Sequence, residues 1–480
     1  MNYQAQLDFV AIVLAAGKGT RMRSSRSKLL HPILGEPLVS YPLHALYQAG
    51  IRHFVVVVGY LSEDVSRSLS SLSFLKDPCV QLHFVVQHTQ QGTGDAVKQA
   101  LLSTALPLHL KNILIVCGDS PHLDVDTLLQ MINTYQTHEQ RLCVLGAHVE
   151  NPYGYGRLHT SADGRCLYSI VEEKEATLEI QQINLVNAGV YAVSRCFLAD
   201  AVQQLKPHVT NGEYYLTDIA NLLKDSQPAL VVTATNPSVV LGVNSQTELL
   251  RSQNLIQARI IKGWQDKGVC ILGSDVMIGP YVLIDSGVVI EHGVTLLGHT
   301  YLAAEVWIEH HVHLKNMHIG HHTRVKSFTY AEDSLIHEHV TLGPMARLRT
   351  QTEIGAHAEI GNFCEIKKST IHEKAKAHHV SYLGDSDVGA RTNIGAGTII
   401  CNYNGVSKPH SYIGADVFVG SHSTLVAPVD IQDSAYIAAG STITEPVPAH
   451  ALAIGRSKQI NKIDYVNKLK DKLKKQKNNL

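Results

Sequence analysis

Two different periods of hydrophobic residues divide the chain near residue 245. In the first part, short apolar runs rich in β-branched residues alternate with polar stretches of helical length, and four of these runs are Val10–Leu14, Phe54–Val58, Leu82–Val86 and Ile113–Val116. Continuous apolar runs are typical of strands buried on both faces of a parallel sheet. Such sheets bind ligands beyond the carboxyl ends of their strands. The glycine-bearing loops after these runs therefore predict a site at that edge.

The second part repeats every six residues from about Cys270 onward. Its aliphatic positions include Leu272, Ile278, Ile284, Ile290, Leu296, Ile354, Ile360, Ile366, Ile431, Ile437 and Ile443. One inward aliphatic residue in six predicts a parallel β-helix. Seven extra residues interrupt the repeat between Ile400 and Ile413, and a second break spans Lys374–Tyr382. Because both breaks flank the same few coils, we expect a site there.

Composition places the chain among globular proteins. The 480 residues are 45% hydrophobic and 17% charged, with a mean hydropathy of −0.00, which predicts two or three domains. No apolar run reaches the roughly 18 residues of a membrane span. The stretch Phe9–Ala16 follows Asp8 rather than a basic segment, so it predicts a buried strand and not a signal peptide. The 8 cysteines form no C-x-x-C pair, which favours reduced thiols and a cytoplasmic location.

The net charge of −1 conceals a basic end. Residues 456–480 hold nine Lys or Arg against two Asp or Glu, and apolar residues recur there at roughly helical spacing. This pattern predicts a short amphipathic helix, to which we assign no function because a solvated terminal helix explains it. The near-neutral charge and the lack of a recognised motif argue against nucleic-acid binding.

A glycine-rich turn follows the first apolar run directly. The segment Leu14–Met22 reads L-A-A-G-K-G-T-R-M, and Lys18, Arg21 and Lys28 place cations near it. It matches neither the Walker A pattern nor G-x-G-x-x-G. Backbone N–H groups in such a turn still suit an anion, so the turn favours a phosphate site. The alternative is a tight strand-to-helix turn with surface lysines.

Longer motifs make the comparison specific. After that turn come Gln87, Gln91–Gly94, Cys117–Asp119, Gly154–Arg157, Val171–Glu172, Asn187–Gly189 and Gly242–Asn244, and in the second part Ala346–Arg349, Gly361–Phe363, Glu365–Lys368, His379–Asp385, Asn393–Thr398 and Cys401–Tyr403. In this order they resemble the bacterial bifunctional N-acetylglucosamine-1-phosphate uridyltransferase and glucosamine-1-phosphate N-acetyltransferase family, from about residue 8 to 457. The resemblance implies an α/β Rossmann-like nucleotidyltransferase domain (1–246), a linker helix (247–267) and a left-handed parallel β-helix acetyltransferase domain with the basic tail (268–480).

For the first domain the resemblance implies uridylyl transfer from UTP to N-acetylglucosamine 1-phosphate. Arg21 and Lys28 are expected to neutralise the triphosphate, and Asp119 and Asn244 to hold Mg²⁺, a hard ion that prefers oxygen ligands. The expected UDP-sugar contacts are Leu14, Ala15, Ala16, Gly17, Lys28, Gln87, Gly92, Thr93, Cys117, Gly118, Asp119, Gly156, Glu172, Asn187 and Asn244. Among these, Gln87 and Gly92-Thr93 are expected to read uracil.

For the second domain the resemblance implies acetyl transfer from acetyl-CoA to glucosamine 1-phosphate, with His379 as general base and His378 as the neighbour easily mistaken for it. The sugar phosphate is expected to contact Arg349, Lys367, Tyr382, Asn393, Asn402 and Lys408. Acetyl-CoA is expected to contact Ala396, Asn402, Tyr403, Ser421, Ala439 and Arg456. Solenoids of this family also imply a homotrimer.

The chain departs from the family pattern at Ser27, Cys117 and Thr350, where Pro, an aromatic residue and Pro are expected. Each change touches backbone shape or packing rather than charge, so we expect activity to be retained. The histidines between His310 and His322 suggest a metal site, but polar corners of a solenoid explain them more simply.

Two other functions compete with this one. A pyrophosphorylase for another sugar or nucleotide could carry a regulatory β-helix, but such a solenoid does not require His379 or the polar loop with Asn402 and Lys408. A non-catalytic trimerising scaffold would not need the charged groups of the first domain.

Overall fold

The computed structural model describes residues 8–138, 141–208, 212–223 and 228–478. It divides into two compact units, 1–260 and 261–480, called here the N-terminal and C-terminal units. Helix α8 (Gln246–Gln265) contains the division between them. No helix in the described ranges is long and apolar enough to cross a membrane.

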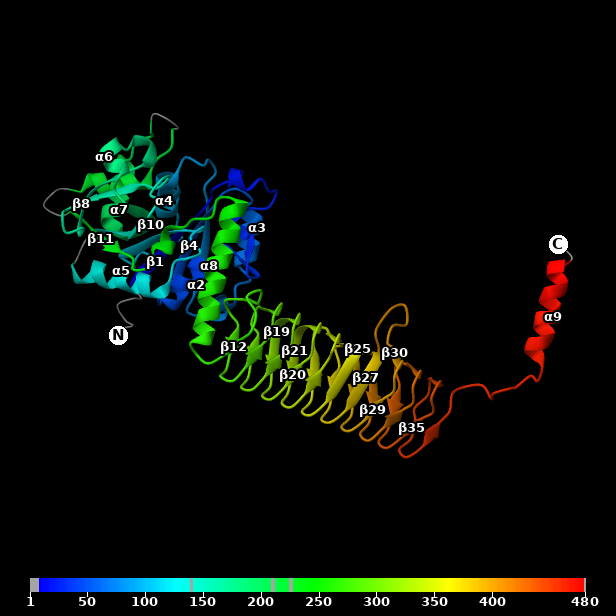
Figure 1. Ribbon diagram of the computed structural model, residues 1–480. Coiled ribbons are helices and arrows are strands. Elements are labelled where there is room, and N and C mark those ends of the chain that lie inside the picture. Colours follow the sequence, from blue (N-terminus) through cyan, green and yellow to red (C-terminus); the bar gives the residue numbers. More distant parts are fainter. Residues whose placement is uncertain (1–7, 139–140, 209–211, 224–227, 479–480) are drawn as a thin grey trace. The chain divides into compact units, whose positions relative to one another are not determined.

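The described N-terminal unit is built on a nine-stranded sheet in the order β5-β4-β1-β6-β10-β7-β11-β9-β8. Figure 1 labels β1, β4, β8, β10 and β11 of this sheet. Strands β1 (Phe9–Ala15), β4 (His53–Val58), β5 (Gln81–Val86) and β6 (Asn112–Cys117) are parallel neighbours, which confirms the four predicted runs. Strand β10 (Leu185–Ser194) then runs antiparallel to both β6 and β7 (Leu142–His148), so the sheet is mixed. The remaining strands are β2 (Pro32–Ile33), β3 (Glu36–Pro37), β8 (Arg157–Thr160), β9 (Cys166–Val171) and β11 (Ala229–Thr233).

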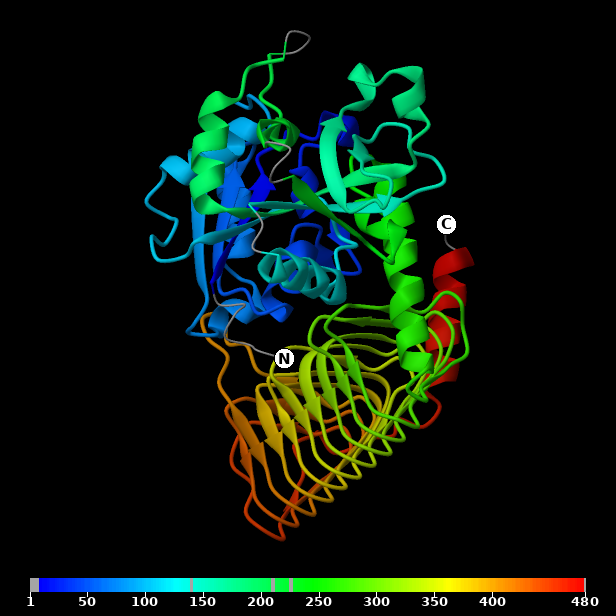
Figure 2. The same cartoon turned by 90° about the vertical axis from the view of Figure 1, so that its left-hand side faces the viewer.

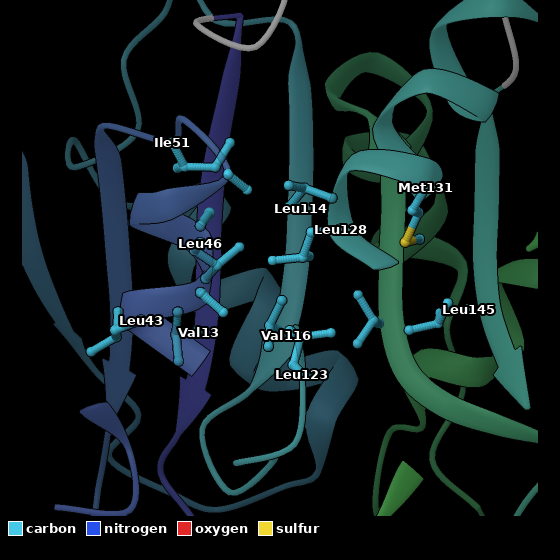
Figure 3. Packing of buried hydrophobic residues seen from close by; sticks show 14 of the residues in the cluster. Val13, Leu43, Leu46, Ile51, Leu114, Val116, Leu123, Leu128, Met131 and Leu145 are labelled. Carbon is cyan, nitrogen blue, oxygen red and sulfur yellow. The ribbon is translucent and has the colours of Figure 1, made fainter. Parts of the chain in front are cut away.

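Helices cover both faces of this sheet, which explains why its strands read as continuous apolar runs. The helices are α2 (Ser40–Gln48), α3 (Ser62–Leu69), α4 (Thr93–Leu102), α5 (Val125–Thr137), α6 (Leu178–Gln181) and α7 (Arg195–Gln204), with the 3₁₀ helices η1 (Thr20–Met22), η2 (Lys28–Leu30), η3 (Ser73–Lys76), η4 (Glu173–Glu175), η5 (Leu216–Leu222) and η6 (Pro237–Val240). Val13 of β1 packs with α2 and α5 on one face (Figure 3). Its neighbour Ile12 packs with α4 and α7 on the other face. Alternate residues of each strand are thus buried on opposite sides.

The described C-terminal unit is a solenoid of 26 short parallel strands. They are β12 (Cys270–Ile271), β13 (Met277–Ile278), β14 (Leu283–Ile284), β15 (Val289–Ile290), β16 (Thr295–Leu297), β17 (Tyr301–Leu302), β18 (Trp307–Ile308), β19 (His313–Ile319), β20 (Arg324–Val325), β21 (Tyr330–Ile336), β22 (Thr341–Leu342), β23 (Arg347–Leu348), β24 (Thr352–Ile354), β25 (Glu359–Lys367), β26 (Thr370–Ile371), β27 (Lys376–Gly384), β28 (Ser386–Val388), β29 (Asn393–Ile394), β30 (Ile399–Cys401), β31 (Ser411–Ile413), β32 (Phe418–Val419), β33 (Thr424–Val426), β34 (Asp430–Ile431), β35 (Tyr436–Ile437), β36 (Thr442–Ile443) and β37 (Leu452–Ala453). Ile278 pairs with Leu296, one coil on, and both side chains are fully buried. The stacked coils are visible in Figure 2, and they confirm the β-helix predicted from the period of six.

The length of the coils varies along the solenoid. Ile278 pairs with Leu296 after three full repeats of six, whereas Ile360 pairs with Ala377, which lies one residue short of that spacing. The predicted break at Lys374–Tyr382 is therefore a shift by one residue, and most of it lies in the long strand β27. Ile394 pairs with Val419 across a longer coil, which accommodates the seven extra residues as a protruding loop after β30 (Figure 1). Helix α9 (Tyr465–Asn478) forms in the basic tail.

Candidate functional sites

A cavity of about 800 Å³ opens at the carboxyl ends of β1, β5 and β6. Its lining includes the predicted residues Leu14, Ala15, Ala16, Gly17, Lys28, Gln87, Gly92, Thr93, Cys117, Asp119 and Glu172. Of the other predicted residues, Asn244 contacts Lys28, whereas Arg21 lies exposed on η1 and outside this lining. The strand ends thus bring together side chains from segments far apart in sequence, as the topology of an open sheet predicts.

Lys28 joins the two expected magnesium ligands. Its Nζ lies 2.5 Å from Asp119 Oδ2 and 3.0 Å from Asn244 Oδ1. The N–H of Val243 donates to the Asp119 carbonyl at 3.1 Å, and the N–H of Asn244 donates to Glu248 Oε2 at 2.6 Å, which fixes the Asn244 backbone at this point. A carboxylate and an amide oxygen that converge in this way are donors suited to a hard divalent cation, so the residues present fit Mg²⁺.

Gln87 and Gly92 form one end of the cavity. Gln87 is buried, and its Nε2 donates to Asp95 Oδ2 at 2.7 Å and to the Gly92 carbonyl at 3.1 Å. With its amide nitrogen held, the planar Gln87 amide is fixed in orientation. Gly92 has φ of +100°, and a Cβ there would lie 2.6 Å from the carbonyl oxygen of Tyr214. Only glycine fits this turn.

Gly156, Glu172 and Asn187 form a second group. The N–H of Asn187 donates to the Gly156 carbonyl at 2.9 Å, and Asn187 Nδ2 donates to the Tyr191 hydroxyl at 2.7 Å. A Cβ on Gly156 would lie 3.5 Å from the carboxylate of Glu172, which places all three side by side. Burial raises the pKa of Glu172, whose Oε1 accepts a hydrogen bond from Thr217 Oγ1 at 3.1 Å. An acceptor-rich surface of this kind suits the N–H and O–H groups of a sugar.

Cys117 lies at the end of β6 where an aromatic residue was expected. Its Sγ contacts the carbonyl of Gly189 at 3.8 Å. Desolvation, aided by the charge of Asp119, raises the pKa of the thiol to about 12. Gly118 holds the strand end to β1, because its N–H donates to the Leu14 carbonyl at 2.9 Å. Cys117 is therefore a neutral packing residue and not a thiolate nucleophile.

In the C-terminal unit the two adjacent histidines have different partners. His379 on β27 pairs in register with Asn362 on β25, and His379 Nδ1 lies 3.0 Å from Asn362 Oδ1. His378 Nε2 lies 3.0 Å from Glu359 Oε2 instead. The ring of His379 is exposed, whereas His378 is held in an ion-pair position beside Lys376, which also pairs with Glu359.

The three cations expected to bind the sugar phosphate, Arg349, Lys367 and Lys408, lie near one another. The neighbouring Lys408 lowers the pKa of Lys367, and the charge of Arg349 adds to this effect. Arg349 Nη1 lies 2.9 Å from Glu365 Oε1, which orients the guanidinium. Lys408 and Arg349 thus lie close enough to Lys367 to destabilise its charged state. Such a group of cations is suited to bind a doubly charged phosphate.

The protruding loop is attached to the same region through Asn402. Its Nδ2 donates to Asp385 Oδ2 at 2.6 Å and to the Tyr382 hydroxyl at 3.3 Å. Gly384 makes room for this contact, since a Cβ there would lie 2.5 Å from Asn402 Nδ2. Asn393 lies on β29 and pairs with Lys376 of β27. These contacts place the sugar-binding candidates on consecutive coils.

The expected coenzyme residues follow one edge of the solenoid. The N–H of His422 donates to the Ala396 carbonyl at 2.7 Å, and the N–H of Gly440 donates to the Ser421 carbonyl at 2.8 Å, so Ala396, Ser421 and Ala439 lie on successive coils. Arg456 approaches the end of this row, with its Cδ 3.8 Å from the Cβ position of Gly440. Tyr403 is exposed in the protruding loop and donates to the Gly405 carbonyl at 2.7 Å.

Sequence reasoning gave no role to Asn362, Glu365 or Asp385, although all three lie in the quoted motifs. Asn362 and Glu365 precede His379 and Tyr382 by one coil and pair with them in register. That spacing is a signal that a search by coil length would find. Of the histidines expected at solenoid corners, His310 stacks on His292 with ring centroids 5.2 Å apart, and His313 stacks on Tyr330 with centroids 4.7 Å apart.

Comparison with known proteins agrees with this geometry. The family model of the MobA-like NTP transferase domain matches residues 11–206. The chain is 40% identical over 465 residues to the bifunctional protein GlmU of Sorangium cellulosum (strain So ce56), which covers 97% of each chain. It is 40% identical over 470 residues to GlmU of Geotalea uraniireducens (strain Rf4), which covers 97% of this chain and 100% of the relative. GlmU of Staphylococcus haemolyticus (strain JCSC1435) is 36% identical over 464 residues, or 95% of this chain and 99% of the relative. Because relatives at 36–40% identity match nearly the whole of this chain and of their own length, the chain belongs to the GlmU family of bifunctional proteins.

Proposed function

We propose that the protein synthesises UDP-N-acetylglucosamine in two steps, with acetyl transfer in the C-terminal unit and uridylyl transfer in the N-terminal unit. The observation that supports the proposal is that each unit of this GlmU-family chain brings candidate groups of its own together: Lys28 with Asp119 and Asn244 in the first unit, and His379 with Asn362 in the second. Acetylation comes first, because its product is the sugar phosphate that the second site uses.

In acetyl transfer His379 is the general base. The amide oxygen of Asn362 can only accept a hydrogen bond, so Nδ1 of the neutral ring carries the proton and Nε2 is free to take one. Nε2 removes a proton from the glucosamine nitrogen as that nitrogen attacks the thioester carbonyl carbon. The C–N bond forms, the C–S bond breaks, and the coenzyme leaves as a thiolate that takes up a proton.

Binding groups on either side position the two substrates. Arg349, Lys367 and Lys408 hold the sugar phosphate, and Tyr382, Asn393 and Asn402 hold its hydroxyls. The edge formed by Ala396, Ser421 and Ala439, with Tyr403 and Arg456, takes acetyl-CoA. Alignment of the amine with the thioester lowers the barrier by removing translational freedom.

In uridylyl transfer a phosphate oxygen of N-acetylglucosamine 1-phosphate attacks the α-phosphorus of UTP, and the bond to pyrophosphate breaks. Lys28 neutralises the triphosphate within the cavity, and Arg21, whose neighbour Thr20 lines the cavity, supplies a second cation from the exposed turn η1. Gln87 and Gly92-Thr93 hold uracil, and Gly156, Glu172 and Asn187 hold the amino sugar. Asp119 and Asn244 would hold Mg²⁺, which when bound supplies charge neutralisation to the phosphates.

We also propose that the chain forms a homotrimer through its solenoid. Phe328, Met345, Phe363 and Val380 follow one another on successive coils and are 44–57% exposed. A continuous apolar edge of this kind is typical of a subunit interface. Light scattering should give three times the chain mass of 52.6 kDa, and Phe363→Asp should reduce this mass.

The free state of the 8 cysteines supports a cytoplasmic location.

Mass spectrometry of products tests the two-step proposal. The purified protein is incubated with glucosamine 1-phosphate, acetyl-CoA, UTP and Mg²⁺, and UDP-N-acetylglucosamine is the expected product. Formation of N-acetylglucosamine 1-phosphate alone would show that the departures at Ser27 and Cys117 changed the N-terminal site. Absence of any acetylated product would contradict the His379 mechanism and favour a pyrophosphorylase with a regulatory solenoid.

A further inference from the structure

His208 lies between two acidic side chains and contacts residues that line the N-terminal cavity. Its Nδ1 is 2.8 Å from Glu175 Oε1 on η4, and its Nε2 is 2.8 Å from Asp218 Oδ2 on η5. The His208 side chain is only 16% exposed, and its ring lies 4.0 Å, centroid to centroid, from that of Tyr215. Glu175 and Tyr215 both line the cavity. His208 thus connects two segments of the cavity wall.

The geometry of these contacts requires a charged ring. Both neighbours are carboxylates, which when ionised only accept hydrogen bonds, and a neutral imidazole has a single N–H to donate. Both contacts at 2.8 Å are therefore satisfied together only by the imidazolium, which donates from both nitrogens. Loss of the proton would leave one lone pair facing a carboxylate, and that contact would open.

The connected segments carry the amino-sugar side of the site. Glu172, which stands next to η4, accepts a hydrogen bond from Thr217, which stands next to Asp218. The backbone of His208 is also joined to the segment 213–218, since the N–H of His208 donates to the Glu213 carbonyl at 2.9 Å. Movement of the segment that carries Tyr215 and Asp218 would therefore disturb Glu172.

We propose that His208 is a positioning residue, which when protonated clamps the segment 213–218 onto the turn 172–175 and so sets the affinity of the uridylyl site for the amino-sugar phosphate. This inference rests on the proposed function. The charged groups that face His208 are Glu175 from η4 and Asp218 from η5, with Glu172 behind them. All three are acidic, so they favour the protonated state.

The direction of the pH effect follows from these neighbours. Burial lowers the pKa of His208, but the hydrogen bonds and charges of Asp218 and Glu175 outweigh burial, and the pKa lies above the ordinary value of 6.5. The clamp is complete below that ordinary value and opens as pH rises through the raised pKa. The KM for the sugar phosphate should rise over the same range, with little change in kcat.

Two substitutions separate charge from structure. His208→Lys keeps a cation with several donors at every pH used, and His208→Gln keeps the polarity without the charge. From about pH 6 to about pH 9, the KM of the wild type relative to that of His208→Lys should rise by about three- to tenfold. His208→Gln should show the high KM throughout. Division by the KM of His208→Lys cancels the effect of titration of the substrates themselves. The matched control is His148→Gln, because the ring of His148 contacts the neutral amide of Asn184.

Acetyl transfer by the same variants reports on the C-terminal unit, and an unchanged kcat of uridylyl transfer reports that the N-terminal unit, which carries His208, is folded. A wild-type KM profile that is unchanged in His208→Gln would overturn the clamp. Hydrogen exchange of peptides covering 205–218 provides a readout that needs no activity, and exchange should be faster in His208→Gln than in the wild type. Absence of UDP-N-acetylglucosamine in the wild type would overturn the proposed function, and in that case unchanged exchange would still overturn the clamp.

Discussion

Asn362 Oδ1 lies 3.0 Å from Nδ1 of His379, across two strands that are neighbours in the solenoid. A backbone register rather than a flexible loop sets this distance, so the ring orientation is built into the coil. The amide also determines which ring nitrogen carries the proton. Catalytic orientation and solenoid geometry therefore depend on the same strand pairing.

Replacement of Asn362 by Asp should shift the pH dependence of acetyl transfer. A carboxylate stabilises the protonated imidazolium, so the acid limb of the pH–rate profile should move to higher pH and the rate near neutrality should fall about tenfold. Initial rates from about pH 6 to about pH 9 measure this shift. Asn362→Ala should lower kcat without moving the limb, and equal profiles for all three proteins would contradict the role of Asn362.

His379→Ala should reduce acetyl transfer by at least about 10²-fold, because no other base replaces Nε2. His378→Ala is the matched control, since His378 pairs with Glu359 and should change the rate less than about threefold. Uridylyl transfer should persist in both variants. Collapse of acetyl transfer in His378→Ala with retention in His379→Ala would reverse the assignment.

Asp119→Asn should lower uridylyl turnover by about 10²-fold and raise the Mg²⁺ concentration needed for half of the maximal rate. The change removes the charge that faces Lys28 and weakens an oxygen ligand. A magnesium titration of initial rates measures both effects. Asp124→Asn, which keeps the N-cap acceptor for Thr127, should behave as the wild type. An unchanged titration in Asp119→Asn would exclude Asp119 as a ligand.

Gly92→Ala should abolish most uridylyl transfer, because its Cβ would overlap the Tyr214 carbonyl and its φ of +100° is unfavourable for alanine. Gly164→Ala has the same kind of backbone, with φ of +72° and nothing within 4 Å of the new Cβ. Strain alone costs about 1 kcal/mol, so the control should stay active. Steady-state rates compare the two, and equal losses would mean that strain rather than overlap is responsible.

Cys117 should resist alkylation by N-ethylmaleimide at about pH 8, although it lines an open cavity. Its pKa of about 12 keeps the thiol protonated at that pH. The exposed Cys79, Cys196, Cys270 and Cys401 serve as internal controls and should react. Peptide mass mapping measures the labelled fraction at each position, and rapid labelling of Cys117 in the native protein would contradict the raised pKa.

The sequence predicts those parts of the fold that depend on local pattern. The four parallel strands follow from apolar runs buried on both faces, and the solenoid follows from its period of six. The antiparallel insertion of β10 between β6 and β7 has no such local signal, because strand order is a property of the assembled sheet.

For the sites as well, the sequence predicts the residues that lie in local motifs but not the contacts between distant segments. Motifs located Lys28, Asp119 and Asn244, but their meeting at one ammonium depends on three segments that only folding brings together. His208 carries no motif, and its two carboxylate partners come from separate segments on either side of it in the sequence. Long-range electrostatic contacts of this kind become visible only in the structure.

The strand pairing of the solenoid has a consequence for how its sequence tolerates change. Each coil pairs only with its neighbours, and normal pairing resumes after the protruding loop, where Thr424 pairs with Thr442. Insertion at a corner is therefore absorbed locally. Deletion of one residue within a strand would instead turn each later side chain of that strand from the interior to the surface. Length at the corners is free to drift over evolutionary time, whereas the inward position of the aliphatic residue in each short strand is constrained by the burial of that residue.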